Sequence, residues 1–591
     1  MKLCDDCKAC LEGTRKTDNG GLCGHHWQLQ DYLSALDHGC WVQLQQKGDD
    51  WLTGPDASWF SYVLVSDTSD ASVTGPDGSF QFHLMFDFDV GNRLQRISRD
   101  AQADAASPAL YLWLQPASPA SDMRIATPAG PSTASPEAWT TADSWIQDCL
   151  QNHTACNDNH GVEFCYPTRL LDVGHGHCAS DVVRLIETVE QLPQGAYVTL
   201  SHCWGKVPFL CTTKENLLFM KAGLHVSKLS KTFKDAIVVT RWLKVRYLWI
   251  DSLCIIQDKQ DLSDWNSESV KMESYYSNAF CNLAATASLN GSEGLFRYRD
   301  PDRVQHMEYA MPGSKSRRAG LYNVFDITLW EKELTQAPLH RRAWVLQERL
   351  LARRVLHFGE RQLMWECHEH TAAEVYPHGI KDVSPLVQRA HFKDLDCSSP
   401  WNQAELKTDD PRTLTLRIWE RIVNQYSQCL LTYPSDRVKA LDGLARRFVR
   451  MLDDECLFGM WKRDMARQLL WRVEGGGLYP PSNSLYTEQR RYAVPTWSWL
   501  STDCAIDTGK PSEIRQLQSQ DILLEVIVPL PNLHSDAHRG LILRCCPLAV
   551  TAILGQHGLW RVKKARADNN NNIRGYTKKL ECTDARIPVK A

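Results

Sequence analysis

The sequence predicts an α/β fold built on a parallel sheet. Between about residues 182 and 288, short apolar runs typical of buried strands alternate with stretches whose apolar residues recur at helical spacing. The strand-like runs cover residues 196–200, 247–250 and 280–285, and a helical pattern lies between each pair. This order favours parallel strands joined by right-handed crossovers.

Two helices are expected within this region. In the first, Ser230 or Thr232 can cap a helix whose apolar positions are Phe233, Ala236, Ile237, Thr240 and Leu243. The second is expected as one continuous helix from Ser263 or Asp264 to about Ala279. Downstream, a helix over residues 341–349 should lead into strands over 354–358 and 362–367.

Charge and composition restrict the function classes. The 591 residues include 66 Lys and Arg against 70 Asp and Glu, and the resulting net charge of −4 disfavours a nucleic-acid scaffold. The first residues lack the apolar core of a secretory signal, and the longest apolar stretch, over 541–554, is interrupted by Arg544 and Pro547. We therefore expect a cytoplasmic protein with no membrane span and no nucleic-acid partner.

The regions outside the α/β pattern differ in composition. Residues 1–114 should hold a lead-in rich in Cys and His and then a small β-rich accessory unit, because alternating runs are separated by Gly-Pro-Asp-Gly chemistry. Residues 115–141 are rich in Pro, Ala and Ser and predict a linker. Residues 561–591 have no apolar period and predict a flexible tail.

The 21 cysteines are expected as free thiols or metal ligands, because a reducing compartment disfavours disulfides. Cys4, Cys7, Cys23 and His25 have ligand-like spacing, although the usual second pair of ligands is incomplete. A second group also has ligand-like gaps without a paired framework: Cys149, His153, Cys156, His160 and Cys165. In both groups the interpretation without a metal is favoured, and no metal site is predicted.

Polar residues follow two of the predicted parallel strands. Residues 201–205 read Ser-His-Cys-Trp-Gly, and residues 251–254 read Asp-Ser-Leu-Cys. Because ligands bind beyond the carboxyl ends of strands in open parallel sheets, Ser201 and Asp251 are candidate catalytic residues in one crevice. The alternative is structural, with Trp204 and Gly205 shaping a turn and His202 a hydrogen-bonded core residue.

Glu268 lies on the apolar track of the second helix, where an unpaired carboxylate is costly. Desolvation would suit it for acid, base or electrostatic chemistry, and we treat it as a catalytic candidate. The alternative is a structural partner for Arg241 or Arg246.

These motifs, taken in order, resemble the fungal heterokaryon-incompatibility (HET) domain family. The matching stretches are residues 167–173, 197–205, 248–258, 264–279 and 342–348, with further similarity at 435–445, 459–471 and 494–499. The resemblance implies a HET domain over 142–370 and a C-terminal α+β region of the family's type over 371–560. One departure is His202, where many relatives place Tyr.

The resemblance implies a module that detects a genetically different partner after fungal cells fuse and then triggers cell death. Its partner is expected to be a protein, or a second copy of the chain. The family has also been likened to the flavodoxin-like TIR fold, whose enzymatic members cleave NAD with a helical glutamate. On that likeness NAD is a candidate substrate, Glu268 is the matching position, and no other cofactor is expected.

A third hypothesis is a Cys-His hydrolase, in which His202 activates Cys203 or Cys254 and Asp251 orients the imidazole. Trp344 is expected as a buried anchor at the start of its helix. The residues expected to line the site in any of these readings are His202, Cys203, Trp204, Gly205, Cys254, Gln257, Arg342, Trp344, Gln347 and Glu348.

Overall fold

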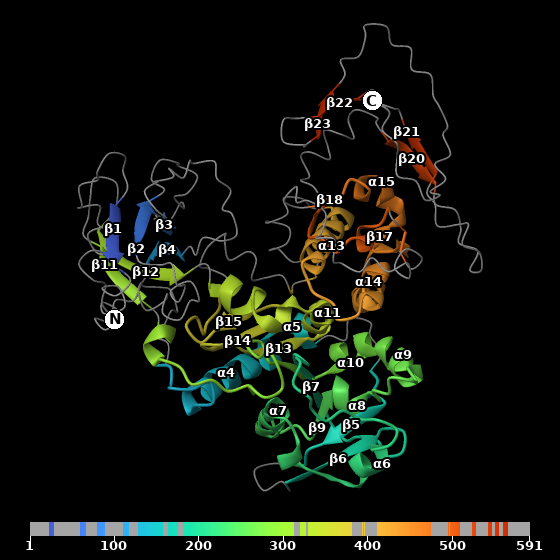
Figure 1. Cartoon of the computed structure of the whole chain (residues 1–591). Coiled ribbons are helices and arrows are strands. Elements are labelled where there is room, and N and C mark those ends of the chain that lie inside the picture. Colours follow the sequence, from blue (N-terminus) through green and yellow to red (C-terminus); the bar gives the residue numbers. More distant parts are fainter. Residues whose placement is uncertain are drawn as a thin grey trace. The chain divides into compact units, whose positions relative to one another are not determined.

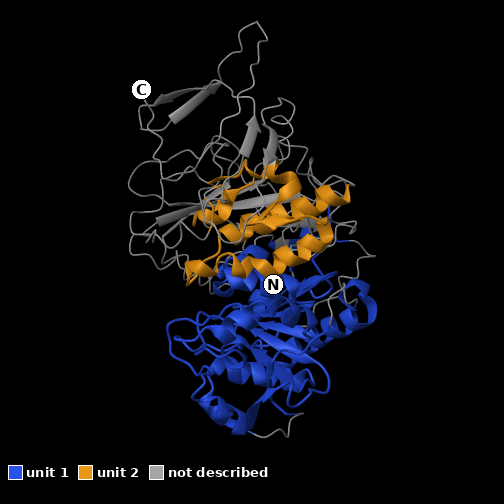
Figure 2. Ribbon diagram, turned by 90° about the vertical axis from the view of Figure 1, so that its right-hand side faces the viewer, with its two compact units in different colours: residues 1–395 blue, residues 396–591 orange. Residues whose placement is uncertain are grey.

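The structure is a computed structural model of the 591-residue chain. It describes residues 128–157, 164–174, 181–305, 307–311, 319–326, 329–380, 410–473 and 497–508, a few single residues between these ranges, and short strands toward both ends. The chain divides into two compact units, residues 1–395 and 396–591, each described here by itself (Figure 2).

A nine-stranded mixed sheet forms the centre of the first unit (Figure 1). Its four parallel strands are β7 (Tyr197–Ser201), β9 (Tyr247–Ile250), β10 (Cys281–Ala284) and β13 (Arg354–Phe358). In space they run β9-β7-β10-β13, so the second strand of the four lies first. The predicted α/β class with a parallel centre is confirmed.

Antiparallel strands extend this sheet on both sides. Beyond β9 lie β5 (Arg169–Asp172), β6 (Val182–Glu187) and β8 (Leu224–His225), and beyond β13 lie β14 (Leu363–Cys367) and β15 (Thr371–Ala373). The sheet is therefore mixed, because only the crossover-linked strands run parallel.

Helix α7 (Lys231–Trp242) connects β7 and β9 as predicted, and Ser230 caps it by accepting a hydrogen bond from the Phe233 backbone N–H at 3.4 Å. The second helix departs from the prediction. It is broken into α9 (Ser263–Ser269) and α10 (Met272–Asn278), and the turn between them is closed by the Lys271 N–H donating to the Glu268 carbonyl at 2.9 Å. Val270 and Lys271 nevertheless keep helical backbone angles, and the Tyr275 hydroxyl of α10 reaches the Glu268 carboxylate of α9 at 2.8 Å.

A second sheet includes strands from far apart in the sequence. Its order is β1 (Cys23–Gln28), β2 (Trp59–Ser66), β3 (Phe80–Phe88), β4 (Leu110–Pro116), β12 (Gly320–Asp326) and β11 (Met307–Met311). The expected accessory unit over residues 1–114 is thus completed by two strands from the α/β region. Cys4 and Cys7 lie outside the described residues, as do the side chains of Cys23 and His25.

Residues 115–141 were expected to form a linker, and the structure describes only part of this range. Helix α4 (Pro136–Asn152) begins inside it, and the Trp139 ring lies 4.5 Å from the Trp242 ring of α7. Pro136 suits the first helical turn, where its missing N–H costs nothing, so this proline marks a helix start. The short helix α5 (Thr154–Asn157) follows.

The second unit contains the helices α13 (Pro411–Ser427), α14 (Lys439–Leu452) and α15 (Met465–Gln468). It also contains the strand pairs β16–β17 (456–457 and 460–461), β18–β19 (472–473 and 506–507), β20–β21 (523–527 and 542–545) and β22–β23 (550–554 and 560–564).

The Trp419 and Trp499 indoles both donate to the Gly459 carbonyl at 3.1 Å. Gly459 has φ +80°, and a Cβ there would lie 2.9 Å from the Trp499 ring, so this position requires glycine.

The first unit begins before residue 142 and ends at Leu395, beyond the expected boundary at residue 370. Strand β23 reaches Lys564, inside the expected tail, and residues 565–591 lie outside the described residues. None of the described helices is long and apolar enough to cross a membrane.

A buried ionic network joins α11 (Ala343–Leu351) to the central sheet. Arg349 on α11 donates to both carboxylate oxygens of Glu366 on β14, at 2.7 and 2.6 Å. His357 on β13 lies 2.9 Å from the same carboxylate. All three side chains are almost fully buried. Although burial raises the pKa of Glu366, Arg349 and His357 hold it well below the usual range, so the carboxylate stays ionised.

Arg349→Ala should lower the free energy of unfolding by about 3 to 5 kcal/mol, because it leaves the Glu366 carboxylate buried and unpaired. Urea denaturation measures this loss. Lys214→Ala is the matched control, since it removes a salt bridge to Asp261 that is exposed on both sides, and it should change nothing detectable. Equal behaviour of the two variants would contradict the assigned role of the network.

Acidification should destabilise the first unit in two steps. Burial lowers the pKa of His357 and of His340, so the unfolded chain binds more protons and stability falls as the pH drops through about 6.5. The depressed pKa of Glu366 adds a second loss below about pH 4.3. Urea midpoints across this range measure the effect, and a midpoint that stays constant down to about pH 5 would contradict neutral burial of both imidazoles.

Candidate functional site

Ser201 ends β7 and connects three elements of the first unit. Its hydroxyl donates to Oε2 of Glu348 on α11 at 2.5 Å, and the Asn282 amide on β10 donates to Ser201 Oγ at 2.9 Å. Tyr276 on α10 also hydrogen-bonds to Glu348. Burial raises the pKa of Glu348, and the nearby Asp251 charge adds to this, which favours the protonated carboxyl.

Asp251, directly after β9, holds the residues that follow Ser201. Its Oδ1 lies 3.1 Å from His202 Nε2, and its Oδ2 accepts a hydrogen bond from the Trp204 indole at 2.9 Å. Arg342 donates to the His202 carbonyl. Burial alone would raise the pKa of Asp251, but His202, Arg342 and Trp204 together lower it. Asp251 is therefore an ionised carboxylate close to a carboxyl that favours its proton.

Two carboxyl groups whose pKa values shift in opposite directions lie at the ends of the neighbouring strands β7 and β9. Glu348, on α11, bonds to Ser201 at the end of β7, and Asp251 follows β9. Glu348 is suited to donate a proton or a hydrogen bond, and Asp251 to stabilise positive charge. Ser201 ends β7, and β10 lies beside β7. Between these two strands the crossover connections leave the sheet in opposite directions. Asp251 lies within hydrogen-bond distance of His202 and Trp204, whereas Ser201, directly before His202, bonds to Glu348 and Asn282.

Glu268 has a different set of partners. Its side chain is 3% exposed, its Oε1 accepts from Thr168 at 2.9 Å and Lys271 at 2.8 Å, and its Oε2 accepts from the Tyr275 hydroxyl at 2.8 Å. Ser201 and Asp251 bond elsewhere, so the hydrogen bonds do not unite the three catalytic candidates in one network.

The structural partners expected for Glu268 were wrong. Arg241 donates through Nε to the Val173 carbonyl at 2.8 Å, and Arg246 pairs with Asp172 at 2.7 Å. Glu268 instead bonds to Tyr275 and Lys271 on its own helical segment and to the distant Thr168.

The two candidate thiols do not favour nucleophilic chemistry. Burial raises the pKa of Cys203 to about 11 and that of Cys254 to about 12, so both thiolates are disfavoured at neutral pH. The Nε2 atom of His202 faces Asp251 instead of a sulfur atom. The Cys-His hydrolase hypothesis therefore finds no activated thiol at these positions.

Two of the other residues expected to line the site, Gln257 and Gly205, lie in the backbone that follows β9 and β7. Gln257 Nε2 donates to the Asp251 carbonyl at 3.2 Å, and Gly205 has φ +64° with no room for a Cβ, which would lie 2.4 Å from Asn290. Gln347 is buried beside Glu348 on α11, and its Nε2 has no partner among the described residues. Trp344 is half-buried, with its ring 6.0 Å from that of Trp265, so it is not the fully buried anchor expected.

Asn282 and Tyr276 belong to the site but were not singled out as site residues. Asn282 carries a readable signal, because it is a polar residue inside an otherwise apolar strand and is 1% exposed. Tyr276 carries none, since an aromatic residue on a helix is equally expected in a core.

Asp251→Asn and Glu348→Gln should differ in their effects on stability. Removing the ionised Asp251 carboxylate weakens charge-assisted bonds and should cost about 1.5 to 3 kcal/mol. Glu348→Gln should stay within about 0.5 kcal/mol or gain stability, because the raised pKa of this carboxyl already opposes its charge. Urea denaturation at neutral pH measures both, and equal losses would contradict the assigned charge states.

Comparison with known proteins gives one finding. No curated protein and no solved structure matches the chain significantly. Residues 197–348 match the family model described as heterokaryon incompatibility protein (HET), and this segment contains Ser201, Asp251, Glu268 and Glu348. The resemblance inferred from the sequence motifs is confirmed, and the chain carries a heterokaryon-incompatibility domain over these residues.

Proposed function

We propose that this protein is an incompatibility module that senses a non-self partner after cell fusion and triggers cell death from the cytoplasm. The HET match over residues 197–348 carries this proposal. The partner it senses is a protein, or a second copy of the chain.

The order of the parallel strands supports a flavodoxin-like, TIR-like centre. Numbered along the chain, the four strands lie in the order second, first, third, fourth, as in flavodoxin-like sheets. In such sheets a ligand binds beyond the carboxyl ends of the first and third strands. Ser201 ends the first of these strands, and Asn282 lies within the third.

The output of the module depends on the site around Ser201, Asp251 and Glu348. Within the matched segment these residues converge from β7, β9 and α11. The raised pKa of Glu348 favours a hydrogen-bond donor in the site, and the lowered pKa of Asp251 favours an anionic group. Such a site suits a polar small molecule or a side chain of the partner.

A second candidate function is NAD cleavage with Glu268 as the carboxylate that stabilises an oxocarbenium-like transition state. The burial of its side chain favours this, because a desolvated carboxylate interacts strongly with developing positive charge. Against it, Thr168, Lys271 and Tyr275 already occupy both oxygens. NAD cleavage therefore ranks second.

Inducible expression of the full chain in a filamentous fungus tests the proposal, with viability as the measurement. The wild-type chain should arrest growth, and Glu348→Gln should reduce killing by about 100-fold or more while remaining folded. The matched control is Glu333→Gln, which alters another buried carboxyl with a raised pKa, paired with Arg361 at 2.8 Å. Full killing by Glu348→Gln at equal protein abundance would refute a role for the site.

Glu268→Gln separates the two candidate functions. The amide should cost about 1 to 2 kcal/mol in the free energy of unfolding, because its NH₂ group would face Lys271 and Tyr275, which both donate to the carboxylate in the wild-type chain. We expect killing to persist and no Glu268-dependent nicotinamide release from NAD. Nicotinamide release by the wild-type chain that disappears in a stable Glu268→Gln variant would establish the second candidate instead.

A further inference from the structure

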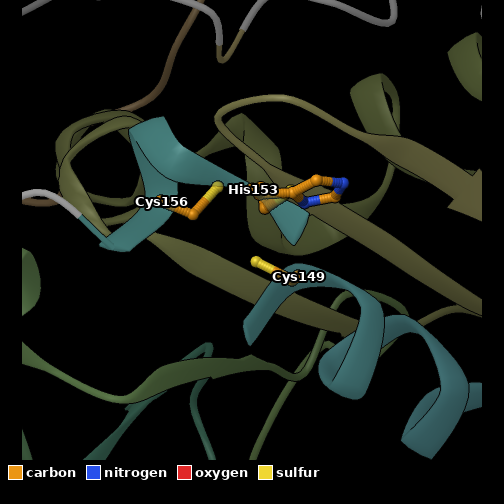
Figure 3. Close-up of side chains that lie close together, drawn as sticks. Cys149, His153 and Cys156 are labelled. Atoms are coloured by element: carbon orange, nitrogen blue, oxygen red, sulfur yellow. The ribbon is translucent and has the colours of Figure 1, made fainter. Parts of the chain in front are cut away.

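A cluster of three cysteines and one histidine lies outside the matched HET segment. Cys149 is in the last turn of α4, His153 caps that helix, and Cys156 is in α5, while Cys367 ends β14. Figure 3 shows the side chains of Cys149, His153 and Cys156 converging. Their ligand atoms and the sulfur of Cys367 all lie within 4.8 Å of one another. We propose that these four residues bind a structural zinc ion.

The donor set and its spacing fit tetrahedral zinc. A zinc ion with Zn–S bonds of about 2.3 Å places its sulfur ligands about 3.8 Å apart and a sulfur and an imidazole nitrogen about 3.6 Å apart. The Nδ1 atom of His153 lies 3.3 Å from Cys367 Sγ. Three thiolates and one imidazole form a recognised structural zinc set, and soft sulfur ligands exclude magnesium and calcium.

The cluster is closed, as a structural site requires. Cys149 and Cys156 are fully buried, Cys367 is 2% exposed, and the His153 side chain is 12% exposed. Four protein ligands complete a tetrahedron and leave no open position for a substrate, so the ion would stabilise the fold and not perform catalysis.

Neighbouring groups orient the ligands and balance their charge. The Nε2 atom of His153 lies 3.3 Å from Asp148 Oδ2, which leaves Nδ1 for the metal, as in carboxylate–histidine–zinc arrangements. The Arg354 guanidinium donates to Cys149 Sγ at 3.2 Å, and the His370 backbone N–H donates to Cys367 Sγ at 3.2 Å. Zn²⁺ with three thiolates carries one net negative charge, which Arg354 offsets.

A disulfide explains the cluster less well. One bond would engage two of the three sulfur atoms and leave a thiol and His153 buried beside it. A zinc ion instead uses all four donors and ties α4 and α5 to the end of β14, across more than 200 residues of chain. The site is independent of the proposed incompatibility function.

Zinc analysis of the purified full-length chain tests the proposal. The combined variant Cys149→Ser/Cys156→Ser should lose one zinc ion per chain relative to wild type, so that any metal held elsewhere cancels in the difference. Cys254→Ser is the matched control, because Cys254 is equally buried but lies outside the cluster, and it should keep the wild-type zinc content. Equal zinc content in the wild type and the double variant would overturn the proposal.

A second variant keeps the test informative where loss of zinc unfolds the chain. His153→Cys preserves four ligands, so it should stay folded and retain the metal, whereas His153→Ala should lose it. In the cobalt-substituted protein, His153→Cys should strengthen the thiolate-to-metal charge-transfer absorption, since a fourth thiolate joins three. Unchanged absorption, or a disulfide between two of the cluster cysteines in peptides mapped without reductant, would overturn the proposal.

Discussion

The buried pair between Arg349 and Glu366 is the interaction on which both the candidate site and the scaffold around it depend. It fixes α11 against β14 with two charge-assisted hydrogen bonds in a nearly dry environment. Glu348, one residue earlier on the same helix, then reaches Ser201. A rotation of α11 would therefore orphan the Glu366 carboxylate as well as break the Ser201 contact, and the first of these losses is the more costly.

Strand β14 connects this helix to the cysteine cluster through its alternation of side chains. Successive residues of a strand point to opposite faces of the sheet, so Glu366 meets α11 while Cys367 meets the ligands from α4 and α5. Arg354, directly opposite Cys367 in the register of β13 and β14, shares the second face and donates to Cys149. One edge of the parallel region thus holds an ionic anchor on one face and a proposed metal anchor on the other.

Features set by residues close together in the sequence were predicted, whereas contacts between residues far apart in the sequence were missed. Strands β7, β9 and β10 follow from apolar runs, the Ser230 cap from capping chemistry, and the positions of Ser201 and Asp251 at the ends of neighbouring strands from the geometry of parallel sheets. The break at Val270 and Lys271 leaves no trace in the apolar period, and that period carries no information about Thr168, the distant partner of the buried Glu268. The fourth ligand, Cys367, lies more than 200 residues from Cys156, and spacing carries no information about such a partner.

The structural unit that holds the site is larger than the matched family segment. That segment ends at Glu348, one residue before Arg349, and excludes Glu366 and the whole cysteine cluster. A chain cut at its boundaries would keep Ser201, Asp251 and Glu348 but lose the buried ionic pair that holds α11 in place. Since Arg349 on α11 bonds to Glu366 outside the segment, the charge states and hydrogen bonds of the site are properties of the first unit as a whole.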